Sequence, residues 1–420
     1  MLKHLAFLAL LFLTSCHVTR FITRNFANIT DHKIFPYTEV NIGDDIYQFP
    51  VSERDPLASM PVNSKNGKKP LTEWLEDETS TTAFLVLQHD SIIYEQYFEG
   101  YAPGDISTIF SVSKSITSLL TGIAADEGKI EDINDPVTKY IPELLEGDPR
   151  FQRLTVRHLL DMRSGLDYKE SYSNPFADMA KLYYGTNQLK QLSKLGFDHE
   201  PGTYHEYQSG TTAILGIVVE RATGVELGKY LEDKVWIPMG MEFPATWSLD
   251  DKRHRSAKSY SGLATTARDL AKIGQLYLQG GNWRGKQIVS ADWVKASVTP
   301  DMTNGAYQYQ WYSVSDTHKN DEKKTAYFPD SLAAVAAGAE LGTENIFTLP
   351  SQRYPGKWYL ESTNGAFYAQ GILNQFIYVD PALDLVIVRQ GKKWDNGYTW
   401  LFRDMREKLE LEDIGRREGN

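Results

Sequence analysis

The sequence contains very little cysteine: Cys16 is the only one among 420 residues. An exported chain with one cysteine cannot form an internal disulfide. The nine histidines are scattered, and neither a His-x-x-x-His nor a His-Glu-x-x-His pattern occurs. Because paired histidines and thiolate clusters are the common zinc ligands, we expect no metal site.

Runs of one charge and long apolar runs are also missing. The 44 Lys and Arg residues face 55 Asp and Glu residues, a formal net charge of −11, and no basic run would follow a phosphate backbone. Nucleic acid is therefore not an expected partner. After the first 16 residues no segment is apolar over the roughly 20 residues that a membrane-spanning helix needs.

The first 16 residues differ in composition from the rest. Lys3 and His4 precede an apolar run at residues 5–13, and residues 13–16 read Leu-Thr-Ser-Cys. This order is typical of a secretory signal peptide. Residues 13–16 also resemble the bacterial lipobox, in which the cysteine is lipidated and begins the mature chain. The resemblance predicts export and a lipid anchor on Cys16; a plain signal peptide cleaved nearby is the alternative.

Strand-like patterns occur near both ends of the remaining chain. Residues 82–88 and 92–98 are rich in β-branched and aromatic side chains and are separated by a short turn. Residues 374–379 and 385–389 form a second such pair, and an amphipathic helix is expected at about residues 398–411. These patterns predict one antiparallel sheet built from both ends of the chain.

The middle of the chain is mainly helical, with helices expected at residues 155–160, 210–223 and 267–278. Strand-rich ends around a helical middle favour an α+β fold with helices flanking the sheet and an inserted helical lobe. The expected organisation is a signal peptide at 1–16, a tether and wrapping segment at 17–80, and one domain at 81–412, with strands at about 81–100 and 340–390 and the lobe at about 110–300.

Ser111 and Lys114 stand three residues apart at the predicted start of a helix. At this spacing two side chains project from the same helix face. A serine hydroxyl becomes a strong nucleophile when a base takes its proton, and a desolvated lysine can be that base. The helix start adds a backbone N–H and a positive dipole end for a developing oxyanion.

A second motif follows at residues 201–210, Pro-Gly-Thr-Tyr-His-Glu-Tyr-Gln-Ser-Gly. With the Ser-x-x-Lys element it resembles the serine β-lactamase and penicillin-binding protein superfamily. The chain is most similar to the class C-like branch, which includes esterases, D-aminopeptidases and 6-aminohexanoate-dimer hydrolases. Stretches at 154–166, 262–271 and 386–388 extend the resemblance over about residues 80–410.

The resemblance implies a β-lactamase/transpeptidase-like fold and a role for each motif residue. Ser111 is implied as the acylated nucleophile and Lys114 as its partner. Tyr207 is implied as the phenolic acid/base that passes a proton to the leaving group, and we expect the charge of Lys114 to lower its pKa. Ser209 stands where the branch often has Asn and is expected to bind substrate.

The third family motif departs from the usual pattern. Relatives carry Lys- or His-Thr-Gly on the strand beside the cleft, whereas this chain has Ala369, Gln370 and Gly371. The resemblance implies that Gly371 permits a close backbone approach, that Ile372 N–H is the second oxyanion donor, and that Gln370 contacts substrate. Since Ala369 is not a cation, the carboxylate of a β-lactam would lose a charged partner.

Two aromatic segments are further candidates for substrate binding. Residues 170–175, Glu-Ser-Tyr-Ser-Asn-Pro, resemble a loop of 6-aminohexanoate-dimer hydrolases in which the tyrosine, here Tyr172, contacts substrate. Residues 307–312, which include Tyr309, are expected to line the pocket. The alternative for both segments is that large aromatic side chains fill the core.

We therefore predict a serine hydrolase that cleaves an ester or amide through an acyl-enzyme at Ser111, without a metal or organic cofactor. Its expected partners are a small-molecule substrate and a membrane, reached through the lipid on Cys16. A D-alanyl-D-alanine peptidase, a β-lactamase and a non-enzymatic lipoprotein of the same fold stay open as alternatives. The β-lactamase alternative requires a cation from another loop, for which Lys258 and Arg268 are candidates.

Overall fold

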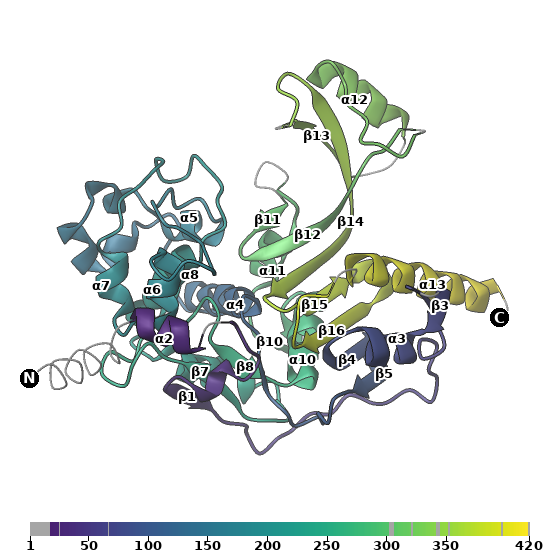
Figure 1. Ribbon diagram of the computed structural model, residues 1–420, viewed down its shortest axis with the longest axis horizontal. Helices are drawn as coiled ribbons and strands as arrows, with labels where there is room; N and C mark the ends of the chain where they lie inside the picture. Colours follow the sequence, from purple (N-terminus) through teal and green to yellow (C-terminus); the bar gives the residue numbers. More distant parts are fainter. Residues whose placement is uncertain are drawn as a thin grey trace, which may run out of the picture.

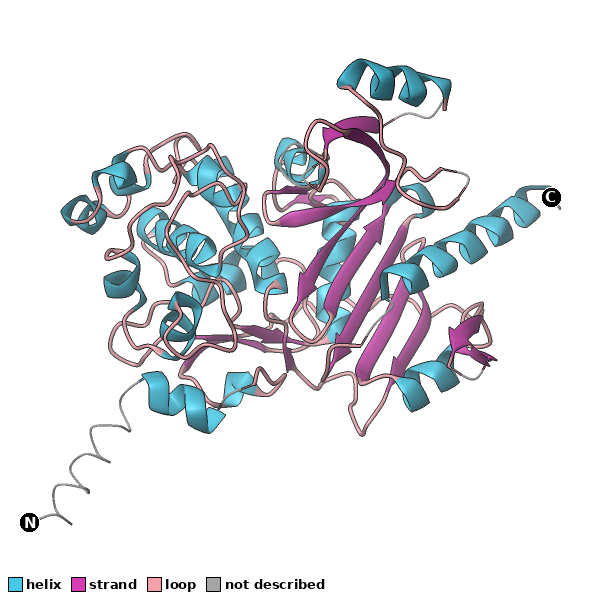
Figure 2. Cartoon of the chain, turned by 45° about the horizontal axis from the view of Figure 1, so that its top comes forward, coloured by secondary structure: helices cyan, strands magenta, loops and turns pink. Residues whose placement is uncertain are grey.

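The computed structural model describes residues 17–418, except for residues 25, 66, 302–305, 321, 342–344, 352 and 396–397. Cys16 and the predicted signal peptide lie outside the described residues. A central sheet with a lobe of helices beside it makes up most of the chain, as Figures 1 and 2 show. This is the α+β arrangement that the sequence predicted.

The central sheet is antiparallel and has eight strands. Their bounds are β4 Thr81–Gln88, β5 Ser91–Tyr97, β11 Tyr307–Gln308, β12 Trp311–Thr317, β13 Ile346–Pro350, β14 Trp358–Gly371, β15 Gln375–Asp380 and β16 Leu385–Gly391. The order is β11-β12-β14-β15-β16-β4-β5, and β13 pairs with β14. Ile387 of β16 lies opposite Val86 of β4, so both ends of the chain share one sheet, as predicted.

Helices cover both faces of this sheet (Figure 2). They are α4 Val112–Asp126 and α10 Ala267–Leu278 on one face, and α3 Leu71–Glu78 and α13 Tyr398–Glu418 on the other. Successive residues of β4 alternate between the two cores: Leu85 faces α4 and α10, whereas Val86 faces α3 and α13. Because both faces are buried, the strand is apolar along its length rather than alternating.

The helical lobe lies between the two strand-rich parts of the sequence. Its helices are α5 Val156–Leu160, α6 Asp178–Tyr184, α7 Gln188–Leu192, α8 Ser209–Thr223 and α9 Leu227–Leu231. Helix ends that were predicted from a capping residue or a terminating glycine are confirmed. Thr155 caps α5 through its side chain, and Gly224 ends α8 in the left-handed conformation at φ 71°.

The segment from residue 17 to residue 80 is more structured than the irregular tether predicted from its composition. It contains α2 His17–Arg24, β1 Tyr37–Val40, the β2 Pro61–Ser64 and β3 Gly67–Pro70 hairpin, and α3. Strand β1 joins a four-stranded sheet with β7 Ala245–Ser248, β8 Leu263–Thr265 and β6 Ser107–Thr108. Contacts between residues far apart in the chain, such as the pairing of β1 with β7, order the segment despite its weak periodicity.

Candidate active site

Ser111 lies at the junction between the small sheet and helix α4. Strand β6 pairs with β8, and the Ile109 N–H then donates to the Leu263 carbonyl at 2.9 Å. Phe110 follows in the left-handed region at φ 47°, a strained conformation for a bulky residue. Ser111 is the N-cap of α4, which places its hydroxyl at the end of the helix.

Lys114 is buried and points at three oxygen atoms. Its Nζ donates to Ser111 Oγ at 3.0 Å, to Ser209 Oγ at 3.2 Å, and to the Tyr260 carbonyl at 3.1 Å. These match the three protons of an ammonium group. Burial lowers the pKa of Lys114 to about 8, while the charge of Glu170 opposes the shift. Lys114 therefore has the position and the pKa of a base for Ser111.

Tyr207 is hydrogen-bonded to the same serine, but its pKa moves in the direction opposite to the prediction. Burial raises the pKa of Tyr207; the hydrogen bond with Ser111 lowers it in part, and the charge of Glu170 adds to the rise. Lys114 Nζ lies 4.8 Å from the centroid of the Tyr207 ring, against its face. The expected lowering by Lys114 is therefore corrected: desolvation wins, and the phenol keeps its proton at neutral pH.

Ser209 connects Lys114 to a carboxylate. Its Oγ donates to Glu170 Oε1 at 2.8 Å, and its backbone N–H donates to Glu170 Oε2 at 2.7 Å. Tyr172 OH donates to Glu170 Oε1 at 2.6 Å. Our sequence analysis gave Glu170 no role, although it stands two residues before Tyr172 in the loop that carried the resemblance. This carboxylate thus holds two of the four predicted substrate-binding residues, Ser209 and Tyr172, in place.

Strand β14 brings the third motif against the nucleophile. A methyl group on Gly371 would lie 2.2 Å from the Ile109 carbonyl oxygen and 3.2 Å from the Ser111 nitrogen, so the approach requires glycine. Ile372 follows at the cavity wall. Gln370 points to the opposite face of the strand, where its Nε2 donates to Asn374 Oδ1 at 3.2 Å. It supports the next turn rather than the predicted substrate contact.

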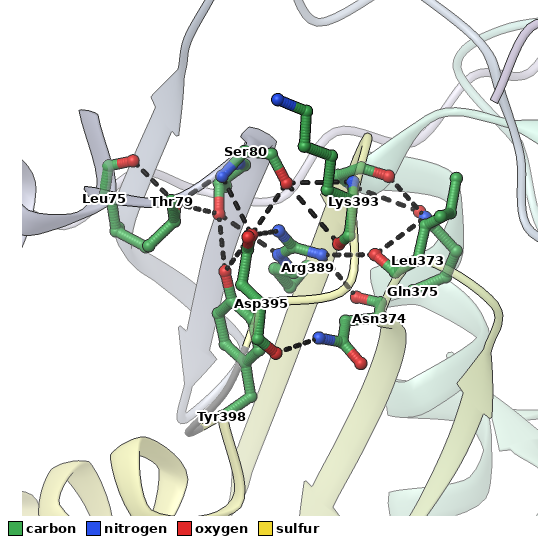
Figure 3. Close-up of polar contacts among 12 residues, drawn as sticks. Leu75, Thr79, Ser80, Leu373, Asn374, Gln375, Arg389, Lys393, Asp395 and Tyr398 are labelled. Carbon is green, nitrogen blue, oxygen red and sulfur yellow. Dashed lines mark hydrogen bonds and ion pairs between the residues drawn. The ribbon is translucent and has the colours of Figure 1, made fainter. Parts of the chain in front are cut away.

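A buried arginine holds the turn that follows Ile372 (Figure 3). Arg389 Nη1 donates to the carbonyl oxygens of Leu373 and Asn374 at 2.6 and 2.8 Å. Its Nη2 pairs with Asp395 at 2.9 Å, and that carboxylate also accepts from the Ser80 hydroxyl at 2.7 Å. Since Leu373 and Asn374 both have positive φ values, of 64° and 61°, this network stabilises an otherwise unfavourable turn.

A cavity of about 250 Å³ opens beside Ser111. Of the predicted site residues, Ser111, Ser209, Tyr172 and Ile372 line it. The remaining lining residues are Phe21, Phe26, Ala27, Phe110, Ser171, Met179, Ala180, Tyr183, Tyr184, Ser261, Leu373 and Trp394. The wall is thus formed by the N-terminal segment, helix α6 and the starts of α4 and α8, together with the loop at residues 171–172, the turn at residues 372–373, Ser261 and Trp394.

Tyr309 is not part of this wall, contrary to the prediction. Its ring packs against Trp293 with centroids 4.9 Å apart, and its hydroxyl accepts from Arg157 Nη1 at 3.0 Å. The chain turns sharply at Tyr309, where φ is 46°, which directs the side chain into the core. From the same segment, Tyr312 instead lies near the catalytic groups and stacks on Tyr207 at 6.5 Å.

The two cations proposed as substitutes for the third-motif lysine are engaged elsewhere. Lys258 is buried, and its Nζ donates to the Tyr183 carbonyl at 2.7 Å. Arg268 forms ion pairs with Glu95 at 2.7 Å and Glu242 at 3.1 Å. Neither side chain lines the cavity. Within the described residues, no group of three or more His, Cys, Asp or Glu side chains is arranged to hold a metal ion.

Comparisons with known proteins agree with this geometry. A model of the Beta-lactamase family matches residues 73–396. A 6-aminohexanoate-dimer hydrolase from Paenarthrobacter ureafaciens is 31% identical over 298 residues, which cover 64% of this chain and 74% of that protein. The chain therefore belongs to the β-lactamase family. It is a serine hydrolase of a family that acts on amide and ester bonds through an acyl-enzyme.

Solved structures show the same fold. A Bacillus anthracis protein described as a candidate 6-aminohexanoate-dimer hydrolase aligns with a TM-score of 0.71 at 22% identity, over 93% of this chain and 94% of that one. EstCE1, a hydrolase with promiscuous acyltransferase activity, aligns with a TM-score of 0.56 at 15% identity, over 80% and 95% of the two chains. The β-lactamase/transpeptidase fold expected from the motifs is thus confirmed.

Proposed function

We propose that this hydrolase cleaves a small, uncharged ester or amide, with Ser111 as its nucleophile. The proposal is carried by one contact: Ser111 Oγ accepts from Lys114 Nζ at 3.0 Å. Tyr207 is the proposed acid, since the same serine is close enough to lower the pKa of its phenol in part. A base and an acid therefore share the hydroxyl that has to lose its proton.

Acylation begins when neutral Lys114 takes the proton of Ser111 and Oγ attacks the carbonyl carbon. With a pKa of about 8, roughly one-tenth of the Lys114 side chains are neutral at pH 7. The backbone N–H groups of Ser111 and Ile372 stabilise the oxyanion. Tyr207 gives its proton to the leaving oxygen or nitrogen and recovers one from Lys114, so that the acyl ester of Ser111 forms as the scissile bond breaks.

Deacylation uses the same groups in the reverse direction. A water molecule attacks the acyl carbon of the Ser111 ester while Lys114, neutral again after acylation, accepts its proton. The tetrahedral intermediate then collapses, the bond from the acyl carbon to Ser111 Oγ breaks, and the proton returns to Oγ. The products are a carboxylic acid and the free hydroxyl of Ser111, and no cofactor takes part.

The cavity favours an uncharged substrate over the two charged alternatives. β-Lactams and peptides that end in D-alanine both carry a carboxylate near the scissile bond. None of the described residues that line the cavity is a cation. A charge-assisted hydrogen bond contributes about 1.5–3 kcal/mol, so its absence should lower kcat/KM by about ten- to hundredfold.

We also propose that the chain is exported and held on a bacterial membrane by a lipid on Cys16, facing the periplasm or cell envelope. The support is the lipobox-like order of residues 13–16 after a short apolar run. In the part of the chain that the structure describes, no helix has the length and apolarity to cross a bilayer.

A fluorophosphonate probe and an ester panel test the catalytic proposal. The wild type should gain the mass of one adduct, whereas Ser111→Ala should gain none and should lose roughly a thousandfold or more in kcat/KM for p-nitrophenyl butyrate. Ser171→Ala is the matched control, since this serine lines the same cavity, and it should still be labelled. Labelling of Ser111→Ala would refute the assignment, and nitrocefin turnover equal to that of the ester would restore the β-lactamase alternative.

A further inference from the structure

Most of the side chains that line the cavity beside Ser111 are apolar or aromatic; the others are Ser111, Ser171, Ser209 and Ser261. Phe110, Ala180 and Met179 are almost fully buried in its wall. At the mouth, Phe26 and Trp394 are 83% and 61% exposed. Among the residues that the structure describes, none of those lining the cavity carries a formal charge. An uncharged aliphatic group would therefore meet mainly hydrocarbon in this cavity.

The tyrosines of the wall present their rings and not their hydroxyls. Tyr183 OH donates to Asp31 Oδ2 at 2.7 Å, and Tyr184 OH donates to the Arg24 carbonyl at 3.1 Å. Tyr172 OH is bound to Glu170, as described above. With these three donors already satisfied by protein groups, the polar groups left to a ligand on this wall are serine hydroxyls, among them the buried Oγ of Ser261, which has no hydrogen-bond partner among the described residues.

The N-terminal segment provides one side of this wall. Helix α2 begins at His17, directly after Cys16, and is fixed to α6: Arg20 Nη1 donates to the Tyr184 carbonyl at 3.0 Å. Phe21 packs edge-on against Tyr184 with centroids 5.7 Å apart. Ala27 and Ile372 pack against the cluster of Ile29, Phe110 and Leu373. The segment next to the predicted anchor is thus built into the active site.

We propose that this cavity is an acyl pocket for an unbranched aliphatic chain, and that Phe21, Phe26 and Ala27 help to set the length of chain it accepts. The inference rests on the proposed function and narrows it to esters or amides of medium-chain fatty acids. A methylene group takes up about the 30 Å³ of a water molecule in the liquid, so 250 Å³ holds about eight such groups. The acyl chain, rather than the leaving group, stays beside Ser111 throughout the acyl-enzyme stage.

Chain-length series on the full-length protein in detergent test the proposal. For p-nitrophenyl esters, kcat/KM should rise by about fourfold per methylene from the acetate to about the octanoate. The octanoate is then the optimum, the length beyond which further methylenes add nothing. Alkyl butyrates of rising alcohol length should show a much weaker trend. A terminal ammonium on the acyl chain, as in 6-aminohexanoyl p-nitroanilide, should reduce kcat/KM by roughly tenfold or more against hexanoyl p-nitroanilide.

Filling the pocket should shorten the preferred chain. Ala27→Leu and Ala180→Leu each add about three carbon atoms to the wall, and the optimum should move down by about three carbons. Ala180 is buried, so a larger side chain there can prevent folding, whereas Ala27 is only partly buried and tolerates one more easily. The two variants therefore test the same wall independently. Ala102→Leu, an exposed position outside the cavity, is the control and should keep the wild-type optimum.

The outcomes separate this inference from the proposed function. A flat acyl series, dependence on the alcohol alone, or an unchanged optimum in both filled variants would overturn the acyl pocket, provided that the fluorophosphonate still labels Ser111. Loss of labelling in the wild type would instead remove the proposed function itself.

Discussion

At the scale of single residues, the chemistry depends on burial, which shifts the pKa values of Lys114 and Tyr207 in opposite directions. Burial lowers the pKa of Lys114 and raises that of Tyr207, although the two groups contact the same serine. Desolvation penalises the charged form of each, so the lysine becomes a better base and the tyrosine stays an acid. A strongly exposed Ser-x-x-Lys pair would have neither property.

The pH dependence of activity tests this assignment. Because Lys114 acts in its neutral form, kcat/KM should rise about tenfold per pH unit below its pKa of about 8 and level off above it. Lys114→Arg, which stays protonated, should lose roughly a thousandfold in kcat/KM and the alkaline rise. The measurement is a pH–rate profile with an uncharged ester.

Lys258 supplies the control for this profile. It is a second buried lysine, whose pKa burial lowers to about 7, but it contacts the Tyr183 carbonyl and not Ser111. Lys258→Met should keep the rising limb of the pH–rate profile, that is, the increase in kcat/KM up to about pH 8. If the limb disappears in Lys258→Met and persists in Lys114→Arg, Lys114 is not the base.

At the scale of elements, the site exists because β14 and the start of α4 come into backbone contact. Gly371 makes the contact possible, and Arg389 fixes the turn beyond it. Breaking a buried, paired charge such as Arg389 is costly, since the partner carboxylate of Asp395 would be left behind. The geometry at Ile372 is thus supported from outside the cavity.

Gly371→Ala should separate these two elements. The added methyl group would meet the Ile109 carbonyl at 2.2 Å, and the strand must move away. A displacement of about 1 Å at a reacting centre costs about a hundredfold in rate, and overpacking costs about 1–3 kcal/mol in unfolding free energy. Ester kinetics and thermal unfolding measure the two effects.

Gly196→Ala is the matched control for that substitution. A methyl group there has no neighbour within 4 Å, so activity and stability should stay close to wild type. Unchanged kinetics in Gly371→Ala would show that the close approach of β14 does not contribute to catalysis.

At the scale of the whole molecule, the N-terminal segment connects the predicted anchor to the active site. Cys16→Ala should abolish incorporation of radiolabelled fatty acid and should move the protein from the membrane to the soluble fraction. Ester turnover should be retained, because α2 begins only at His17 and the catalytic groups are distant in sequence. Labelling that survives the substitution would contradict the lipid anchor.

Much of the architecture was predictable from local signals. The hairpins at 82–98 and 374–389 and the helices at 155–160, 210–223 and 267–278 all occur close to their expected bounds. The α13 helix also begins at Tyr398, as expected, but continues to Glu418. Such elements carry strong periodicity and clear caps, whereas α2 and β1 are short and take their order from contacts with α6 and β7.

The sequence by itself determined the family and the main candidates for catalysis, because Ser111, Lys114 and Tyr207 stand in motifs whose spacing constrains the chemistry. Only the tertiary structure decided the protonation of Tyr207, the part played by Glu170, and the exclusion of Tyr309 from the cavity. Each of these depends on burial or on contacts between residues far apart in the chain. A motif specifies which groups are present, while packing decides which of them lose water and which meet.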